Sequence, residues 1–384
     1  MLPGFTARCK EVQMETRRLK RIDSKEHTEE SREAYRTARN RKGRIIKKAL
    51  RQAHRERVEE ASETPEKMWK LAKWANKRGT NTHALIPALK GDTGELITDP
   101  SAKADLLCQS FFPRPPEPDL TDTEDYEYPP PITLPLITAR EIREAVVKAP
   151  AKKAPGTDGI PNGILHKVLN QILPHLEHLF NACLRIGYYP KHFRTSTTVV
   201  FRKEGKESYQ NAKSYRPIAL LNTIGKALES ILANRISHCV EAYNLLPDLH
   251  IGGRKSRSTE HAIHHILESI YGAWDEGKVA SLLLLDVSGA YDNVSHQRLL
   301  HNLKKRRLDT SIVELIRSFL TSRTTTLSFD GYESAPYATN TGIPQGSPLS
   351  PILYLFYNAD LIKACNTELN TKALGYVDDV GIVT

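Results

Sequence analysis

Near the end of the chain, two adjacent carboxylates, Asp378 and Asp379, stand between two short apolar runs. The runs 373–375 (Ala-Leu-Gly) and 380–383 (Val-Gly-Ile-Val) are typical of strands, so we expect a β-hairpin with the aspartates at its turn. Two like charges side by side repel each other, and a divalent cation removes that cost. The pair therefore predicts a metal site, and an ordinary polar surface turn is the alternative.

A third aspartate ends another apolar run. Residues 279–285 (Val-Ala-Ser-Leu-Leu-Leu-Leu) are too few for a helix of their own, and they lead directly into Asp286. We interpret the run as a strand buried on both faces, with a helix-capping Asp286 as the alternative. If this strand neighbours the hairpin, Asp286 and Asp378 converge, and two metal ions bridged by them would lie roughly 3.5–4 Å apart.

The net charge of +10 is unevenly distributed along the 384 residues. Residues 1–80 carry a net charge of +11 and the remaining 304 residues a net charge of −1. Residues 29–60 lack proline and have a narrow apolar stripe, which predicts a long exposed helix with a break near Gly43. We expect a second helix over 65–76. These helices either bind the phosphates of a polyanion or are solvated helices that pack on another domain.

Composition excludes several classes of protein. The five cysteines have no paired spacing, which argues against a disulfide framework or a zinc site and favours a reducing compartment. No apolar run approaches the roughly 20 residues needed to span a bilayer, and the N-terminus lacks the apolar core of a signal peptide. We therefore expect a nuclear or cytoplasmic protein without a membrane partner. Glu11 and Glu15 leave little support for a mitochondrial presequence.

The amino-acid composition changes twice after the basic segment. Glycines and a Pro-rich acidic run at 113–135 predict a linker over residues 81–136, with a short helix at 102–112. From residue 137 the sequence is globular. We expect helices at 139–148, 162–187, 224–240, 260–274 and 352–364, others starting near 295 and 311, and strands at 198–201, 215–221, 324–329 and 337–341.

Two cations lie at or near strand ends. Lys203 follows the strand at 198–201, and Arg216 begins the strand-like run at 215–221. Phosphoryl transfer needs positive groups on a triphosphate, and both residues are candidates. A surface ion pair of Arg216 with Glu204 or Glu207 is the alternative.

Five short sequence motifs follow one another in the second part of the chain. They are 154–161 (Ala-Pro-Gly-Thr-Asp-Gly-Ile-Pro), 215–222 (Tyr-Arg-Pro-Ile-Ala-Leu-Leu-Asn), 285–292 (Leu-Asp-Val-Ser-Gly-Ala-Tyr-Asp), 342–351 (Gly-Ile-Pro-Gln-Gly-Ser-Pro-Leu-Ser-Pro) and 376–379 (Tyr-Val-Asp-Asp). Together they resemble the reverse transcriptase of LINE-like non-LTR retrotransposons, most of all the elements of filamentous fungi. The resemblance spans about 137–384. Residues 1–136 resemble more loosely the segment between endonuclease and polymerase.

The resemblance implies an α+β right-hand polymerase, with fingers and an antiparallel palm sheet at 137–384 and a helical N-terminal extension. It also implies that the thumb is absent and that the chain ends within the palm. Asp286, Asp378 and Asp379 would be catalytic metal ligands, helped by the carbonyl of Val287. The expected cofactor is two Mg²⁺ ions, with Mn²⁺ as a substitute.

The resemblance also assigns residues around the nucleotide. Tyr291 would be the steric gate against a 2′-hydroxyl, and the N–H groups of Gly289 and Ala290 would face the triphosphate. The remaining assigned residues are Lys203 and Arg216 on the phosphates, Gln345 and Gly346 beside nucleotide and template, and Arg254 and Arg257 on a nucleic-acid backbone. Besides Arg216, alternatives stay open for four of them: Tyr291 as a core aromatic, Gln345 as a helix cap, and Arg254 and Arg257 as plain loop charges. We interpret Asp292 as structural.

The predicted function is that of an RNA-directed DNA polymerase, which adds dNTPs to a primer 3′-hydroxyl. Its partners would be an RNA template and a DNA primer or target. We expect poor activity of this chain alone, because the thumb is expected to be missing. Alternatives are an intron-encoded or telomeric reverse transcriptase, an RNA-dependent RNA polymerase, which Tyr291 argues against, and a non-catalytic nucleic-acid-binding relic. The target site, template and oligomeric state stay unassigned.

Overall fold

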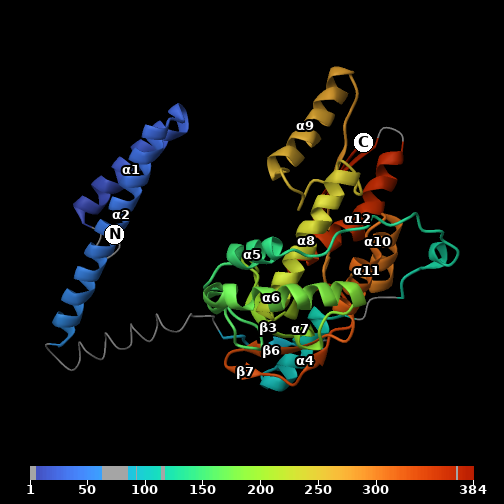
Figure 1. Cartoon of the computed structure of the whole chain (residues 1–384), viewed down its shortest axis with the longest axis horizontal. Coiled ribbons are helices and arrows are strands. Elements are labelled where there is room, and N and C mark those ends of the chain that lie inside the picture. The colour runs from blue at the N-terminus through green and yellow to red at the C-terminus, as the bar shows by residue number, and fades with distance from the viewer. Residues whose placement is uncertain (1–5, 63–84, 92, 114–116, 369–370) are drawn as a thin grey trace. The chain divides into compact units, whose positions relative to one another are not determined.

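The computed structural model describes residues 6–62, 85–91, 93–113, 117–368 and 371–384. The chain divides into two compact units, Met1–Leu85 and Ile86–Thr384 (Figure 1). None of the helices in the described ranges is long and apolar enough to cross a membrane.

The first unit contains a helical hairpin of α1 (Ala7–Glu26) and α2 (Glu29–Ser62). The helices pack through the buried residues Cys9, Val12, Thr16 and Ala38. Helix α2 runs unbroken through Gly43, so the predicted break is wrong: glycine costs a helix interior only about 1 kcal/mol relative to alanine. The helix predicted at 65–76 lies outside the described residues.

The second unit begins earlier than the predicted globular region. Residues 86–112 do not form a separate linker, because the side chains of Ile86, Leu89, Leu107 and Phe111 are buried in one cluster with strands of the unit. This segment contains the hairpin of β1 (Leu89–Lys90) and β2 (Leu96–Ile97) and helix α4 (Pro100–Phe111). From residue 117 to 138 the chain has no regular secondary structure apart from the short 3-10 helix Thr121–Thr123.

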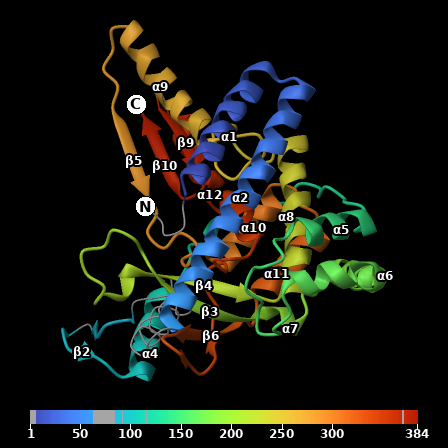
Figure 2. The same ribbon diagram turned by 90° about the vertical axis from the view of Figure 1, so that its left-hand side faces the viewer.

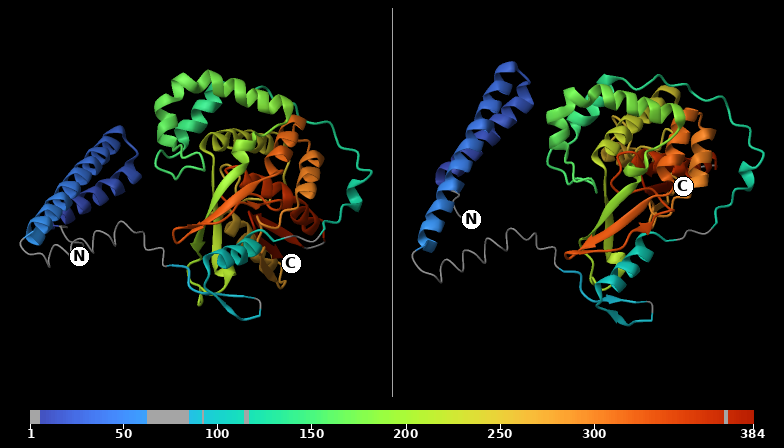
Figure 3. Two further views of the ribbon diagram at one scale, coloured as in Figure 1. Left: turned by 90° about the horizontal axis from the view of Figure 1, so that it is seen from below. Right: turned by 60° about the horizontal axis from the view of Figure 1, so that its bottom comes forward.

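A five-stranded sheet has the order β4-β3-β6-β7, with β8 also paired to β6. Its strands are β3 (Thr195–Arg202), β4 (Tyr215–Leu221), β6 (Thr324–Phe329), β7 (Tyr332–Glu333) and β8 (Tyr337–Ala338). Strand β3 pairs antiparallel with β4 and parallel with β6. Figure 3 shows β3 and β6 side by side, with α4 next to them. The predicted strands at 198–201, 215–221 and 324–329 are confirmed.

A three-stranded antiparallel sheet has the order β5-β10-β9. Its strands are β5 (Leu282–Asp286), β9 (Lys372–Tyr376) and β10 (Asp379–Val383), and they lie beside α9 (Thr259–Asp275) in Figure 2. Helices α9 and α12 (Ser350–Thr367) contact β9, and α9 also contacts β10.

The prediction that residues 279–286 are buried on both faces is wrong. Strand β5 is the edge of its sheet, and the exposed fractions of Leu282–Leu285 range from 40% to 69%. A run of leucines shows that a strand is apolar, but it does not show whether helices cover that strand.

Helices form the main core of this unit, where Phe180, Leu228, Leu315 and Phe356 are among the fully buried side chains. The helices are α4 (Pro100–Phe111), α5 (Ala139–Lys148), α6 (Asn162–Ile186), α7 (Lys191–Arg194), α8 (Thr223–Tyr243), α9 (Thr259–Asp275), α10 (His296–Lys305), α11 (Thr310–Leu320) and α12 (Ser350–Thr367). A capping box of Thr138 and Glu141 starts α5, as the sequence predicts.

Candidate active site

The three aspartates meet at one end of the three-stranded sheet. Asp378 lies in the turn between β9 and β10, and Asp379 begins β10 directly opposite Asp286 of β5. Opposite residues of antiparallel strands have Cα atoms about 4.5–5.5 Å apart. Burial, followed by the charges of Asp378 and Asp286, raises the pKa of Asp379. The predicted hairpin and its pairing with the Asp286 strand are therefore confirmed.

The turn that carries Asp378 is held in an unusual conformation. Val377 has φ 59°, in the left-handed region that a β-branched residue rarely occupies. The backbone of Gly252 packs so closely behind it that a Cβ on Gly252 would lie 2.4 Å from the Val377 nitrogen. The N–H of Ile251 also donates to the Gly375 carbonyl at 2.8 Å. This close support explains how the chain holds a strained turn beside the carboxylates.

Arg254 belongs to that support. Its side chain is buried, and its Nε and Nη2 atoms each donate to a carboxylate oxygen of Glu241 at 2.8 Å. Its Nη1 atom donates to the Pro247 carbonyl at 2.9 Å. The guanidinium is thus engaged inside the protein and does not face a nucleic acid. Arg257 is half-buried and donates to the Asp248 carbonyl.

The turn after β5 presents backbone donors. Gly289 has φ +62°, and its carbonyl accepts from the N–H groups of Asp292 and Asn293 at 3.0 and 2.9 Å. Among the hydrogen bonds of the described chain, none uses the N–H of Gly289 or Ala290 as donor. Successive free N–H groups in a turn form a concave site suited to an anion.

An open cleft of about 920 Å³ is lined by residues of both the three-stranded and the five-stranded sheet and the loops next to them. Ten predicted residues line it: Lys203, Arg216, Asp286, Val287, Gly289, Ala290, Tyr291, Gln345, Gly346 and Asp378. Asp379, Arg254 and Arg257 do not belong to its lining. Lys206 and Lys213 also line the cleft, and the sequence analysis missed them. Their position in the loop that joins β3 to β4, close to Lys203, was the available signal.

The side chain of Tyr291 both packs and faces the cleft. Its ring stacks on Tyr354 of α12 with a centroid distance of 5.4 Å, and it is half-buried against the helical core. Burial and the charge of Asp378 raise the pKa of Tyr291 to about 12. The core-aromatic and gate interpretations are therefore compatible, because packing on Tyr354 fixes the ring beside Asp378.

Gln345 is held by neighbours from two other segments. Its Nε2 atom donates to Asp292 Oδ1 at 3.0 Å, and its carbonyl accepts from the N–H of Ala219 in β4 at 2.8 Å. The N-cap of α12 is Leu349, without a side-chain cap bond, so the helix-cap alternative for Gln345 is wrong. Burial raises the pKa of Asp292 to about 6, while the Gln345 bond and the charge of Lys203 oppose the rise.

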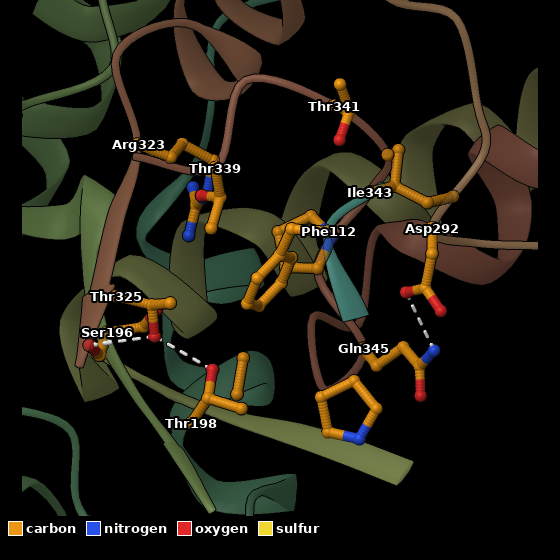
Figure 4. Close-up of a pocket in the computed structure, with 14 residues that line it drawn as sticks. Phe112, Ser196, Thr198, Asp292, Arg323, Thr325, Thr339, Thr341, Ile343 and Gln345 are labelled. Atoms are coloured by element: carbon orange, nitrogen blue, oxygen red, sulfur yellow. Dashed lines mark hydrogen bonds between the residues drawn. The ribbon is translucent and has the colours of Figure 1, made fainter. Parts of the chain in front are cut away.

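A small pocket lies behind this pair. Figure 4 shows the Asp292–Gln345 hydrogen bond on one side of Phe112 and Thr325, bonded to Ser196 and Thr198, on the other. The pocket separates the Gln345 loop from β3 and β6, so contacts with Asp292 and Ala219 are important for the position of Gln345.

In the described ranges, no group of three or more His, Cys, Asp or Glu side chains is arranged to hold a metal ion. Asp286 and Asp378 nevertheless reach the cleft together with Val287. Carboxylate and carbonyl oxygens are the donors that Mg²⁺ prefers, and in phosphate-transferring sites water and substrate phosphates usually complete its coordination. The donor set therefore fits a hard divalent ion that is held jointly with a phosphate ligand.

Comparison with known proteins agrees with this arrangement. Residues 201–384 match the family described as "Reverse transcriptase (RNA-dependent DNA polymerase)". The chain is 30% identical to the RNA-directed DNA polymerase from mobile element jockey of Drosophila melanogaster, over 83% of this chain and 35% of the relative. It is 32% identical to the jockey polymerase of Drosophila funebris, over 65% of this chain and 27% of that relative.

A third relative is the probable RNA-directed DNA polymerase from transposon BS of Drosophila melanogaster, 30% identical over 76% of this chain and 33% of the relative. The chain thus spans about a third of the length of these relatives. A solved telomerase from Candida albicans, in complex with a fragment of telomeric RNA, aligns with a TM-score of 0.37 and 14% identity over 52% of this chain and 39% of that chain, a likeness too weak to carry an argument. From residue 201 onward, the chain is similar to the reverse transcriptases of non-LTR retrotransposons of the jockey type.

Proposed function

We propose that this chain provides the fingers and palm of an RNA-directed DNA polymerase that adds dNTPs to a primer 3′-hydroxyl. The observation that carries the proposal is the cleft, which is lined both by carboxylates at one end of the three-stranded sheet and by cations in β4 of the five-stranded sheet and in the loop between β3 and β4. The first sheet would be the palm and the second part of the fingers. RNA template and DNA primer are the proposed nucleic-acid partners.

Asp286, Asp378 and the Val287 carbonyl are the groups that would hold Mg²⁺, or Mn²⁺ in its place, with Asp379 as the third carboxylate. Two such ions, when bound, activate the attacking oxygen and stabilise the leaving oxygen of an in-line displacement. The support for this assignment is the direct pairing of Asp379 with Asp286 and the exposure of Asp286 and Asp378 to the cleft.

The cleft also offers groups for a triphosphate. Lys203, Arg216, Lys206 and Lys213 line the same cleft as Asp286 and Asp378. Fixed cations and free N–H groups bind the negative charge of the phosphates and stabilise the additional charge that develops in the transition state. The N–H groups of Gly289 and Ala290 would supply the neutral part of this binding.

Tyr291 and Gln345 would select the nucleotide. The ring of Tyr291, fixed by Tyr354, would collide with a 2′-hydroxyl and favour deoxynucleotides. Gln345 and Gly346 would contact the nucleotide and the template base. We propose Arg257, but not the buried Arg254, as a contact to the nucleic-acid backbone. Fungal type and the absence of a thumb stay predictions.

Primer extension on poly(rA) with an oligo(dT) primer tests the proposal. We expect weak, Mg²⁺-dependent extension by the purified chain, and loss of extension in Asp378→Asn with RNA binding retained. Extension at the normal rate by Asp378→Asn would contradict the assigned role. RNA binding by the unaltered chain without any extension would favour a non-catalytic relic instead.

A further inference from the structure

A buried carboxylate lies beneath the loop that carries Gln345. Glu229 of α8 has an exposed fraction of 0%. Its Oε1 atom accepts from the Tyr189 hydroxyl at 2.5 Å, and its Oε2 atom accepts from the Ser347 hydroxyl at 2.5 Å. In the part of the chain that the structure describes, no Lys or Arg nitrogen forms an ion pair with it within 4.0 Å. The charges of the buried Arg323 and of Lys226 interact with Glu229 from beyond that distance. Burying a carboxylate without a close ion pair costs free energy, so its two hydrogen bonds are what hold it in place.

Ser347 connects Glu229 to the Gln345 turn. The Ser347 hydroxyl donates to Glu229 and accepts from the N–H of Leu349 at 3.1 Å. The N–H of Ser347 donates to the Pro344 carbonyl at 3.2 Å. Ser347 therefore fixes the turn that contains Gln345 through its main chain, and the N-cap residue of α12 through its hydroxyl.

Gly346 links Gln345 to Ser347, so a movement of Ser347 also moves Gln345. Gly346 has φ +126°, and a Cβ there would lie 2.6 Å from the Ala219 carbonyl oxygen of β4. On the other side of Gly346, the Gln345 carbonyl accepts from the Ala219 N–H at 2.8 Å. Because the loop is pressed against β4, it has little room to absorb a movement of Ser347, and Gln345 must move with it.

The other partner of Glu229 is the tightly packed side chain of Tyr189. Tyr189 is fully buried, and its ring packs edge-on against Phe193 and Phe319 with centroid distances of 5.7 and 5.2 Å. Burial, and then the charge of Glu229, raise the pKa of Tyr189 well above its usual value, so its hydroxyl remains a donor. The Tyr189 bond therefore uses the carboxylate oxygen away from the loop, and the other oxygen binds Ser347.

We propose that Glu229 is a positioning residue that acts through Ser347 to hold Gln345 at the cleft. It would thereby determine how tightly and how selectively the site takes the incoming nucleotide. The inference rests on the proposed role of Gln345 in nucleotide binding. Glu229 touches neither the cleft nor the carboxylates: it is not among the cleft-lining residues.

Three variants separate positioning from simple stability. Ser347→Ala removes the bond between the loop and Glu229, and Glu229→Gln replaces one acceptor oxygen by a donor. Tyr189→Phe is the matched control, because it removes the other hydroxyl from the same carboxylate and leaves the Ser347 bond in place. We expect Ser347→Ala and Glu229→Gln to raise the KM for dNTP about tenfold, with kcat changed less than about twofold, the size expected for one buried hydrogen bond. Tyr189→Phe should lower the melting temperature without this change in KM.

A second measurement does not need turnover. Hydrogen exchange over residues 342–350 should become faster in Ser347→Ala and Glu229→Gln than in the unaltered chain, and stay unchanged in Tyr189→Phe. Unchanged exchange in Ser347→Ala would overturn the inference whether or not the chain polymerises. An equal rise of KM in Tyr189→Phe and Ser347→Ala would overturn it too, since the network would then be only structural. A failure of the unaltered chain to extend or bind dNTP would count against the proposed function instead.

Discussion

The three-stranded and the five-stranded sheet both supply residues to one cleft, but their strands differ in how far their side chains are buried. In β3 and β6 of the five-stranded sheet, buried and half-buried residues alternate, and Thr198, Thr325 and Leu327 are almost fully buried. Every residue of β5 in the three-stranded sheet is exposed. Lys203 follows the well-covered strand β3 and Arg216 lies in its neighbour β4, whereas Asp286 ends an exposed strand.

The difference shows that side-chain burial is not what positions Asp286. Its place is fixed by main-chain pairing of β5 with β10, in register over five residue pairs from Asp286–Asp379 to Leu282–Val383. The five-stranded sheet is fixed both by main-chain pairing of its strands and by packing of its buried side chains. We therefore expect the carboxylate end to tolerate changes in β5 side chains but not changes in the carboxylates themselves.

The largest effect should come from Asp286→Asn. Removing this charge should lower primer extension on the order of 10³-fold, because an amide neither neutralises nor holds a divalent ion as a carboxylate does. Lys203→Ala should lower extension only about tenfold, since Arg216, Lys206 and Lys213 line the same cleft. Rates on poly(rA)/oligo(dT) measure both. Equal losses would contradict the view that the carboxylates are individually essential while the cations share their task.

Asp286→Asn should not unfold the protein. Asp286 is exposed, and surface substitutions usually change stability by less than about 0.5 kcal/mol. A melting temperature equal to that of the unaltered chain is the control for this prediction.

A stability measurement tests the two sheets directly. Leu327→Ala in β6, where Leu327 is 0% exposed, should lower the free energy of unfolding by about 2–5 kcal/mol. Leu284→Thr in β5, where Leu284 is 69% exposed, should change it by less than about 0.5 kcal/mol. Urea denaturation of the full chain measures both values. A large loss in Leu284→Thr would show that β5 is covered in solution.

The same contrast explains what the sequence could predict. Hydrophobic periodicity and the five sequence motifs predict β3, β4, β6, the aspartate hairpin and most helices, because those signals are local. The coverage of β5 depends on which helices fold over it, and a run of leucines is compatible with either outcome. Arg254 looks like a loop charge until Glu241 is found beside it.

The position of Glu229 could not be predicted from the sequence, for a related reason. A glutamate inside a helix has the same local pattern whether it faces solvent or core. Its partners, Tyr189 and Ser347, lie 40 and 118 residues away in sequence, and neither belongs to a pattern that includes Glu229. Long-range hydrogen bonds between isolated side chains leave no periodic signal, so only the fold shows them.

Tyr291 lies between the exposed edge strand β5 and the packed helical core, and its replacement should give the most specific effect. Tyr291→Ala should remove the stacked ring and increase ribonucleotide use relative to deoxynucleotide use by about tenfold or more, equivalent to about 1.4 kcal/mol of discrimination. Tyr291→Phe is the matched control: it keeps the ring on Tyr354 and should keep the discrimination. Competition between rNTP and dNTP in single-nucleotide extension measures the ratio. If Tyr291→Ala discriminates as well as Tyr291→Phe, the ring serves only to pack against α12, and the gate must be formed by another residue.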